Sequence, residues 1–207
     1  MNQVLFEISN IIFDLGGVIL DIDIKGVYSK FVQIGIETEY NGFGQFQNNK
    51  IFKNYEIGAL STEEFKNEIR KAAKPDFNIQ TFDSIWNSII LNYPKENIRI
   101  LENLKPKYRT FLMSNTNELH YNYYTEILHK EYGYKNLDQL FEKAYYSHTT
   151  KMRKPDACFF ELILRENNLD PENTLFIDDY IENIEAAASL GIKTLHLKDG
   201  YKLANYF

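Results

Sequence analysis

Residues 10–21 read NIIFDLGGVILD, and this stretch decides the fold class. It begins with a short apolar run that ends in a carboxylate at Asp14 and is followed by Gly16 and Gly17. An apolar run of this length bounded by glycine is typical of a buried strand. We therefore predict a buried strand that ends at Asp14.

Four more apolar runs follow along the chain, and helical patterns separate them. The expected strands lie at 110–113, 143–146, 174–177 and 193–197, and the helical patterns at 96–104, 117–129, 157–167 and 180–190. Alternating strands and helices predict a parallel sheet with helices on both faces. We therefore expect a doubly wound, Rossmann-like α/β core whose ligand site lies at the carboxyl ends of the strands.

Residues 24–93 interrupt this alternation, because they contain no convincing strand pattern. Helical patterns occupy 24–34, 43–54, 61–73 and 81–91. Ser61-Thr62-Glu63-Glu64 has the pattern of a capping box at the start of the third helix. We therefore predict two parts, an α/β core domain of residues 1–22 and 94–207 and a small α-helical cap domain of residues 23–93.

Composition limits the classes of protein to which the chain can belong. It has 207 residues, 44% of them hydrophobic, and a formal net charge of −6, which disfavours nucleic acid as a partner. A single cysteine excludes a disulfide framework and favours a reducing, cytoplasmic location. The most apolar stretch, 4–24, is interrupted by acidic residues, so we expect neither a membrane span nor a signal peptide. The oligomeric state is not indicated.

Polar residues follow the predicted strands at four places that should share one edge of the sheet. They are Asp14, Ser114-Asn115, the loop 151–154 and Asp178-Asp179. Each of them alone is common in a turn or a helix cap. Together they fit a phosphoryl-transfer site, because a carboxylate can attack phosphorus and form a covalent intermediate.

The charges of such a reaction need partners, and the sequence supplies them. Asp14 and Asp179 offer the hard oxygen ligands that Mg²⁺ prefers. Lys154 can neutralise the nucleophile and the phosphoryl oxygens, and Ser114 and Asn115 can donate hydrogen bonds to those oxygens. The expected partner is therefore a small phosphorylated molecule, with Mg²⁺ as cofactor.

Four segments resemble the four motifs of the haloacid dehalogenase (HAD) superfamily of hydrolases, in the family's order. They are FDLGGVILD (13–21), FLMSNTN (111–117), MRKPD (152–156) and FIDDYIEN (176–183). The helical insert also matches the position of that family's helical cap. The resemblance implies a Mg²⁺-dependent phosphatase, and the sequence looks most similar to the branch of sugar-phosphate phosphatases that includes α-D-glucose-1-phosphate phosphatase.

The resemblance also implies a role for each residue of the site. Asp14 would be the nucleophile, and Lys154 would hold the charge balance. Together with Asp14, the backbone carbonyl of Gly16 and the side chain of Asp179 would complete the Mg²⁺ site, with Asp178 behind these ligands. Ser114 and Asn115 would bind the phosphate. Asn183, one helical turn after Asp179, is expected to orient the carboxylates.

Gly16 departs from the family pattern, because family phosphatases usually carry an aspartate there that protonates the leaving alcohol. General acid catalysis contributes typically ~10²–10⁴-fold. Its absence favours an anomeric phosphate such as glucose 1-phosphate, whose leaving group needs less protonation. The alternative is a catalytically impaired member that binds a phosphorylated ligand or a protein. A metal-free dehalogenase is disfavoured, because the pair Asp178-Asp179 would repel the nucleophile without a cation.

Three further sites each allow a functional and a purely structural interpretation, and a fourth, Cys158, has only a structural one. His148 either supplies the missing proton or is a loop histidine in solvent. Lys151, where the family often has glycine, either adds a cation near the substrate or is a solvated loop residue. Residues 55–58, which include Glu56, either form a specificity loop or a plain turn. Cys158 is expected to be a small buried side chain in its helix.

Overall fold

The computed structural model describes residues 7–33, 50–72, 78–198 and 200–207. Five parallel strands form one sheet in the order β3-β2-β1-β4-β5, so β1 is central. The strands are β1 (Asn10–Phe13), β2 (Arg109–Ser114), β3 (Lys143–Tyr146), β4 (Thr174–Asp178) and β5 (Lys193–His196). Each lies where the sequence predicts it, and the predicted α/β fold class is confirmed.

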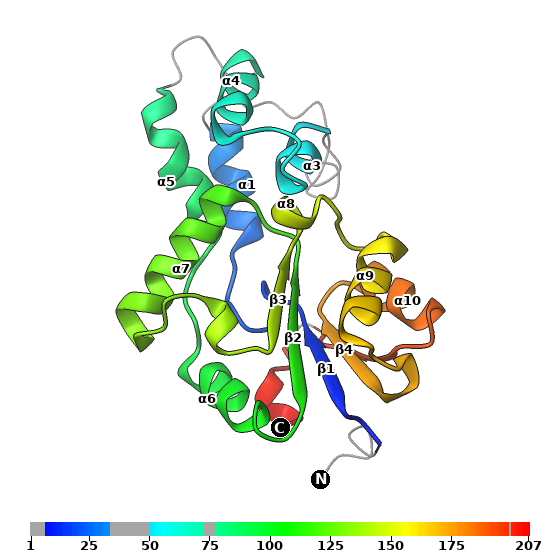
Figure 1. Ribbon diagram of the computed structural model, residues 1–207. Helices are drawn as coiled ribbons and strands as arrows, with labels where there is room; N and C mark the ends of the chain where they lie inside the picture. The colour runs from blue at the N-terminus through cyan, green and yellow to red at the C-terminus, as the bar shows by residue number, and fades with distance from the viewer. Residues whose placement is uncertain (1–6, 34–49, 73–77, 199) are drawn as a thin grey trace.

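Helices cover both faces of this sheet (Figure 1). One face carries α6 (Lys95–Leu104) and α7 (Glu118–Tyr132), and the other carries α9 (Ala157–Asn167) and α10 (Ile181–Ser189). The short helix α8 (Ser147–Thr150) follows β3 directly. Short 3₁₀ turns complete this part: η3 (Leu137–Gln139), η4 (Pro171–Asn173) and η5 (Leu203–Asn205).

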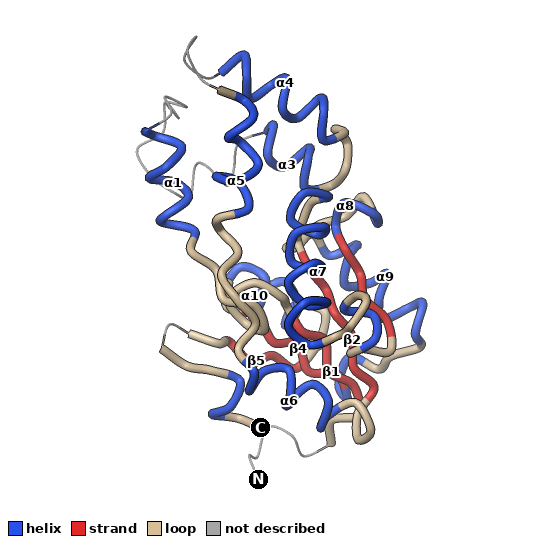
Figure 2. Tube along the Cα trace, turned by 90° about the vertical axis from the view of Figure 1, so that its left-hand side faces the viewer, coloured by secondary structure: helices blue, strands red, loops and turns tan. Residues whose placement is uncertain are grey.

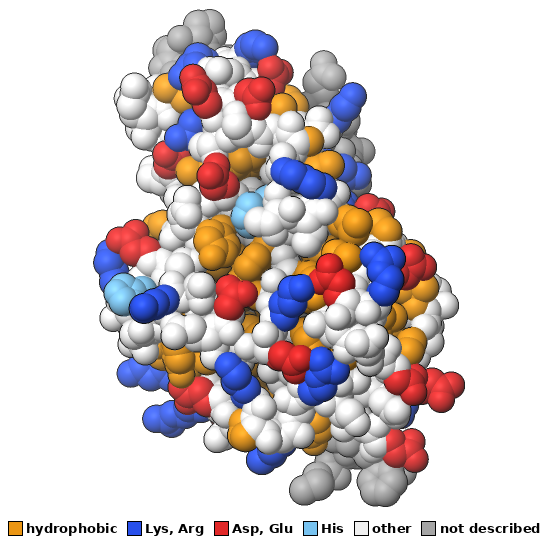
Figure 3. All heavy atoms as spheres, in the orientation of Figure 1, with side chains coloured by type: hydrophobic (Ala, Val, Ile, Leu, Met, Phe, Trp, Pro, Cys, Tyr) orange, Lys and Arg blue, Asp and Glu red, His pale blue; other side chains and the backbone are white. Residues whose placement is uncertain are grey.

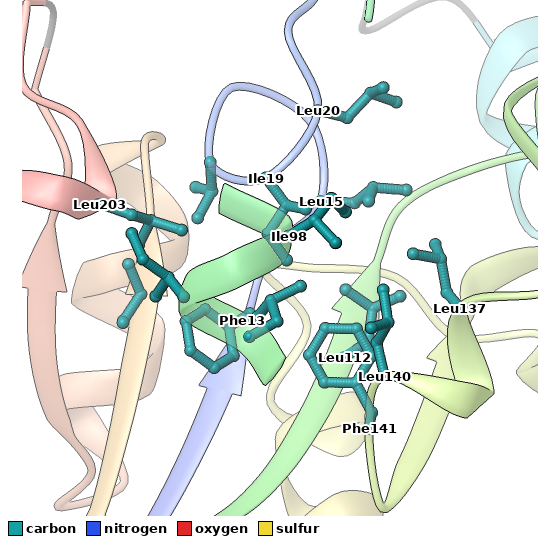
Figure 4. Close-up of a cluster of buried hydrophobic side chains, with 14 of the residues drawn as sticks. Phe13, Leu15, Ile19, Leu20, Ile98, Leu112, Leu137, Leu140, Phe141 and Leu203 are labelled. Atoms are coloured by element: carbon teal, nitrogen blue, oxygen red, sulfur yellow. The ribbon is translucent and has the colours of Figure 1, made fainter. Parts of the chain in front are cut away.

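Alternation along the strands divides the core into two clusters. Ile11 and Phe13 of β1 face α6 and α7, whereas Ile12 between them faces α9 and α10. Figure 4 shows Phe13, Leu112 and Phe141 pointing into the first cluster. Because both faces of the sheet are covered, the central strands β1 and β4 contain continuous apolar runs instead of alternating with polar residues, whereas the edge strand β5 is only half-buried.

The remaining helices stand beyond the carboxyl ends of the strands and form the cap (Figures 1 and 2). They are α1 (Ile24–Gln33), α3 (Lys50–Glu56), α4 (Thr62–Ala72), the 3₁₀ turn η2 (Ile79–Thr81) and α5 (Phe82–Asn87). Their buried side chains form a cluster of their own, rich in aromatic rings. The predicted domain boundaries at 22/23 and 93/94 stay a prediction.

The cap differs in detail from the predicted helices. The capping box is confirmed, since the Ser61 main-chain N–H donates to Glu64 and the Glu64 N–H donates to the Ser61 hydroxyl. Of the candidate at 43–54, residues 43–49 lie outside the described residues. The helix predicted at 81–91 ends at Asn87. The residues after it bond instead to the segment 21–23, where Asp23 donates to the carbonyl of Ile89.

The prediction for Cys158 is wrong, because this side chain is exposed. Helix α9 buries Phe159, Phe160 and Ile163 against the sheet, and Cys158 lies outside that stripe.

Among the helices that the structure describes, none is both long enough and apolar enough to cross a membrane. On the face shown in Figure 3, basic and acidic side chains intermingle without a tract of one sign.

Candidate active site

Three carboxylates meet at the carboxyl ends of the two central strands. Asp14 follows β1 directly, Asp178 ends β4 and Asp179 comes next. Phe13 pairs with Ile177 across these strands, which places Asp14 beside Asp178. Carboxylate oxygens of all three residues lie within 4.8 Å of one another. The register of the parallel sheet therefore builds the acidic cluster that the sequence predicts.

Lys154 reaches this cluster from the loop that follows α8. Its ammonium group lies 2.5 Å from Oδ1 of Asp14 and 2.7 Å from Oδ2 of Asp178. The side chain of Asn115 holds the main chain of this lysine, accepting from its N–H at 2.8 Å and donating to its carbonyl at 2.9 Å. Asn115 thus positions Lys154, a contact that the sequence did not predict. Its binding to phosphate stays a prediction.

Asp178 is fully buried, and both of its carboxylate oxygens are engaged. Oδ1 accepts from the main-chain N–H of Tyr180 at 2.8 Å, and the Asn183 amide lies 3.1 Å from both oxygens. The ammonium group of Lys154 also donates to Oδ2 of Asp178. Asp178 therefore lies at the buried side of the cluster in contact with Asn183, and the roles that the resemblance implies for these two residues stay predictions.

Asp14, Gly16 and Asp179 form the side of the cluster that lines the cavity. The Asp179 carboxylate lies against Gly17, whose φ is +77°, and a Cβ at Gly17 would collide with it. Glycine at position 17 is therefore required both by the backbone conformation and by this close approach. His196 donates from Nε2 to the main-chain carbonyl of Asp179 at 3.0 Å and fixes this residue from the other side.

The cluster holds more negative than positive charge. Burial raises the pKa of Asp14 to about 8, although Lys154 opposes the shift. Burial and the neighbouring Asp178 raise the pKa of Asp179 to about 6. Burial alone would lower the pKa of Lys154, but Asp14 and Asp178 outweigh it and the pKa is raised, so the lysine stays charged. One ammonium group faces three carboxylates, and the donor set therefore fits a hard divalent cation such as Mg²⁺.

The cluster opens into a cavity of about 620 Å³ between the core and the cap. Core residues Asp14, Gly16 and Lys154 line it together with cap residues such as Phe52 and Trp86. Ser114 is buried at the end of β2 and is not among the described residues that line the cavity. The binding of phosphate by its hydroxyl stays a prediction.

A network that sequence reasoning missed joins the cap to the core beside this cavity. Asn117 caps α7, and its Oδ1 accepts from the His120 N–H at 3.1 Å and from the Trp86 indole at 3.2 Å. The His120 ring stacks on Trp86, and its Nε2 donates to the Trp86 carbonyl at 3.1 Å. Nδ1 therefore accepts from Asn117, and burial lowers the pKa of His120 to about 4. This histidine is neutral at physiological pH.

His148 is not placed to donate a proton to the substrate, and Lys151 is not placed to add a cation beside it, because neither is among the described residues that line the cavity. His148 lies on α8, half-buried against Tyr121 and Tyr146, and it is outside the described lining of the cavity. Burial lowers its pKa, which does not favour a proton donor. Lys151 is exposed and ends α8, and its ammonium group donates to the carbonyl of Gly58 in the cap at 2.5 Å.

The chain is similar to known hydrolases in sequence and in fold. Residues 11–197 match the family model for haloacid dehalogenase-like hydrolases. D-ribitol-5-phosphate phosphatase of Bacteroides thetaiotaomicron is 26% identical over 193 residues, which span 93% of each chain.

Among the solved structures that resemble this chain, two match nearly its full length. A HAD family enzyme of B. thetaiotaomicron, in complex with magnesium and inorganic phosphate, is 32% identical with a TM-score of 0.82, covering 97% of this chain and 99% of its own. A predicted HAD-like hydrolase of Porphyromonas gingivalis is 29% identical with a TM-score of 0.82, covering 94% and 93%.

Proposed function

The chain belongs to the haloacid dehalogenase-like hydrolases, and we propose that it is a Mg²⁺-dependent phosphatase of a small sugar or sugar-alcohol phosphate. The observation that supports this proposal best is that Asp14 lies 2.5 Å from the buried ammonium group of Lys154, and both residues line a cavity. The B. thetaiotaomicron relatives support the phosphatase activity and the need for magnesium, because one is named a phosphatase and the other was solved with magnesium and phosphate.

The reaction has two steps that both take place at Asp14. In the first, a carboxylate oxygen of Asp14 bonds to phosphorus while the bond from phosphorus to the leaving oxygen breaks. In the second, water attacks the aspartyl-phosphate and releases inorganic phosphate, which restores the carboxylate. Lys154 favours the charged form of Asp14 and is proposed to contact the phosphoryl group, and Ser114 and Asn115 are proposed to bind the phosphoryl oxygens.

Asp14, Asp179 and the backbone carbonyl of Gly16 are the proposed ligands of Mg²⁺. When bound, the ion supplies positive charge that offsets the repulsion between the carboxylates and the phosphate. Asp178 completes the site from behind by holding Lys154. The loops after β1 and β4 are packed against each other at Gly17 and Asp179, which keeps the two proposed carboxylate ligands together.

Gly16 restricts the leaving group that this site can expel. No side chain at this position can protonate the departing oxygen, so water or the substrate has to supply the proton. An anomeric oxygen leaves as a more acidic alcohol than a primary one and depends less on that proton. We propose that glucose 1-phosphate is turned over faster than glucose 6-phosphate. The competing function, binding without turnover, rests on Gly16 alone.

A substrate panel tests the proposed function. Purified protein with Mg²⁺ is expected to release phosphate from at least one of glucose 1-phosphate, ribitol 5-phosphate and glucose 6-phosphate. Excess EDTA should reduce the rate at least ~100-fold, since the carboxylates would then repel the phosphate. Full activity in EDTA would contradict the role of the metal. Absence of release from any phosphate ester, with ribitol 5-phosphate still bound in calorimetry, would favour the binding function.

Restoring an acid at position 16 is expected to broaden the activity. A Cβ added at Gly16 would lie 3.1 Å from Cδ1 of Ile22, so the design needs Ile22→Val, which removes that methyl group. Gly16→Asp in this background should raise kcat/KM for glucose 6-phosphate ~100-fold over Ile22→Val alone. The rate for glucose 1-phosphate should rise less. Equal rates for glucose 6-phosphate in the two variants would refute our account of Gly16.

A further inference from the structure

The cap loop 55–58 is anchored to the core at two main-chain positions. The Ser147 hydroxyl lies 2.6 Å from the carbonyl oxygen of Glu56, and Lys151 donates to the carbonyl of Gly58 at 2.5 Å. Gly58 has a φ of +60°, and a Cβ there would collide with the carbonyl of His148. Helix α3, which ends at Glu56, lies beside α8 in Figures 1 and 2. These contacts fix where the Glu56 side chain begins.

The side chain of Glu56 is fixed as well, by an ion pair inside the cavity. Arg153 donates from Nε to Oε2 of Glu56 at 2.7 Å, and the two side chains are 20% and 27% exposed, respectively. Both residues line the cavity that also contains Asp14 and Lys154. Arg153 directly precedes Lys154 in the chain, so one short segment contributes one cation to the carboxylate cluster and another to the ion pair with Glu56.

This pair leaves hydrogen-bonding groups available to a ligand. Within the described part of the chain, Oε1 of Glu56 and the two Nη groups of Arg153 have no hydrogen-bond partner. A carboxylate accepts hydrogen bonds and a guanidinium donates several, so together they match an alcohol, which does both. Since the two charges cancel, the pair does not call for a second anionic group on the ligand.

We infer that Glu56 and Arg153 determine specificity by binding adjacent hydroxyl groups of the leaving alcohol. This inference rests on the proposed function and concerns the part of the substrate that the Glu56–Arg153 pair would bind. The enzyme should therefore select phosphates of polyhydroxylated alcohols over phosphates of plain alkyl chains. Apolar neighbours such as Ile24, Val27 and Phe52 complete the wall and can contact the carbon skeleton.

A matched pair of substrates tests this selection. Ribitol 5-phosphate and pentyl phosphate have the same five-carbon chain, and only the first has hydroxyl groups. In Glu56→Gln and in Arg153→Met, the ratio of kcat/KM for ribitol 5-phosphate to that for pentyl phosphate is expected to fall ~10-fold or more, mostly through KM. Glu63→Gln, an exposed position of the same cap, is the control and should keep the parent ratio.

The alternative role for the pair is a latch that only holds the cap closed. Loss of a latch would lower both rates together, so an unchanged ratio in both variants would overturn the inference. Binding supplies a second readout. Calorimetry of ribitol 5-phosphate with Mg²⁺ and the Asp14→Asn protein should show ~10-fold weaker affinity after adding Glu56→Gln. A parent protein inactive on every ester would instead reject the proposed function, and unchanged affinity in calorimetry would reject the inference by itself.

Discussion

Asp14→Asn is expected to reduce phosphate release ~10⁴-fold or more, because an amide cannot form the bond to phosphorus that the first step requires. The substitution keeps the size of the side chain and removes one negative charge beside Lys154. The protein should therefore still fold and bind the substrate. The measurement is kcat with Mg²⁺ on the best phosphate ester of the panel, with Asp14→Ala as a second variant.

The control for this experiment is Asp138→Asn, at an exposed position in η3. It should retain the activity of the parent. Intact mass of acid-quenched parent protein during turnover should also reveal one added phosphoryl group, which is absent in Asp14→Asn. If Asp14→Asn turned over the substrate at the parent rate, the assignment of the nucleophile would be wrong.

The same substitution should change how stability depends on pH in the absence of metal. The pKa of Asp14 is about 8 in the folded chain, above its ordinary value near 4, so the folded state holds a proton that the unfolded state has lost. The free energy of unfolding should therefore fall as the pH rises from about 4 to 8. Asp14→Asn should flatten this dependence, most clearly above pH 6, where Asp179 has also lost its proton. Denaturant unfolding in EDTA at pH 6 and pH 8 measures it, and equal slopes for parent and variant would contradict the explanation.

Lys154→Met is the second change with a large expected effect, and it should impair both stability and catalysis. Lys154, Asp178 and Asp14 are 2%, 0% and 8% exposed, so removing the ammonium group leaves two buried carboxylates without their cation. Breaking a buried ion pair in this way typically costs about 3–5 kcal/mol. The loss of electrostatic stabilisation should also lower kcat by ~10²–10³-fold in protein that remains folded.

Lys107→Met is the matched control, because Lys107 is exposed in the loop before β2, at the far end of the sheet from the site. It should change the free energy of unfolding by less than about 0.5 kcal/mol. Denaturant unfolding should show the difference, and the loss in Lys154→Met should be smaller at pH 5 than at pH 8. At low pH the carboxylates can take up protons in place of the missing ammonium group. An equal loss for Lys154→Met and Lys107→Met would contradict the buried ion pair.

The elements that the sequence predicts correctly share a simple local cause. The central strands β1 and β4 are buried on both faces, so each contains a continuous apolar run, and each run is followed by a carboxylate where the chain leaves the sheet. The capping box at Ser61 is equally local, because its two hydrogen bonds join residues three apart. Such signals do not depend on the rest of the fold.

The errors arise where distant segments decide the outcome. The helix predicted to 91 stops at Asn87 because residues 21–23 offer its next residues other hydrogen bonds. Cys158 lies between apolar neighbours in sequence, yet the rotation of α9 against the sheet leaves it exposed. The sequence also did not predict that the Asn115 amide bonds to the main chain of Lys154, which lies 39 positions along the chain.

By itself the sequence determined the α/β class and the strands, and it indicated the residues that we propose to carry the chemistry, because apolar runs, turns and motifs are local patterns. Only the tertiary structure decided which oxygens Lys154 contacts, that the Asn183 amide contacts Asp178, and that Glu56 pairs with Arg153. Those contacts join residues from 5 to 140 positions apart. They depend on the register of the parallel strands and on the docking of the cap, which no local pattern specifies.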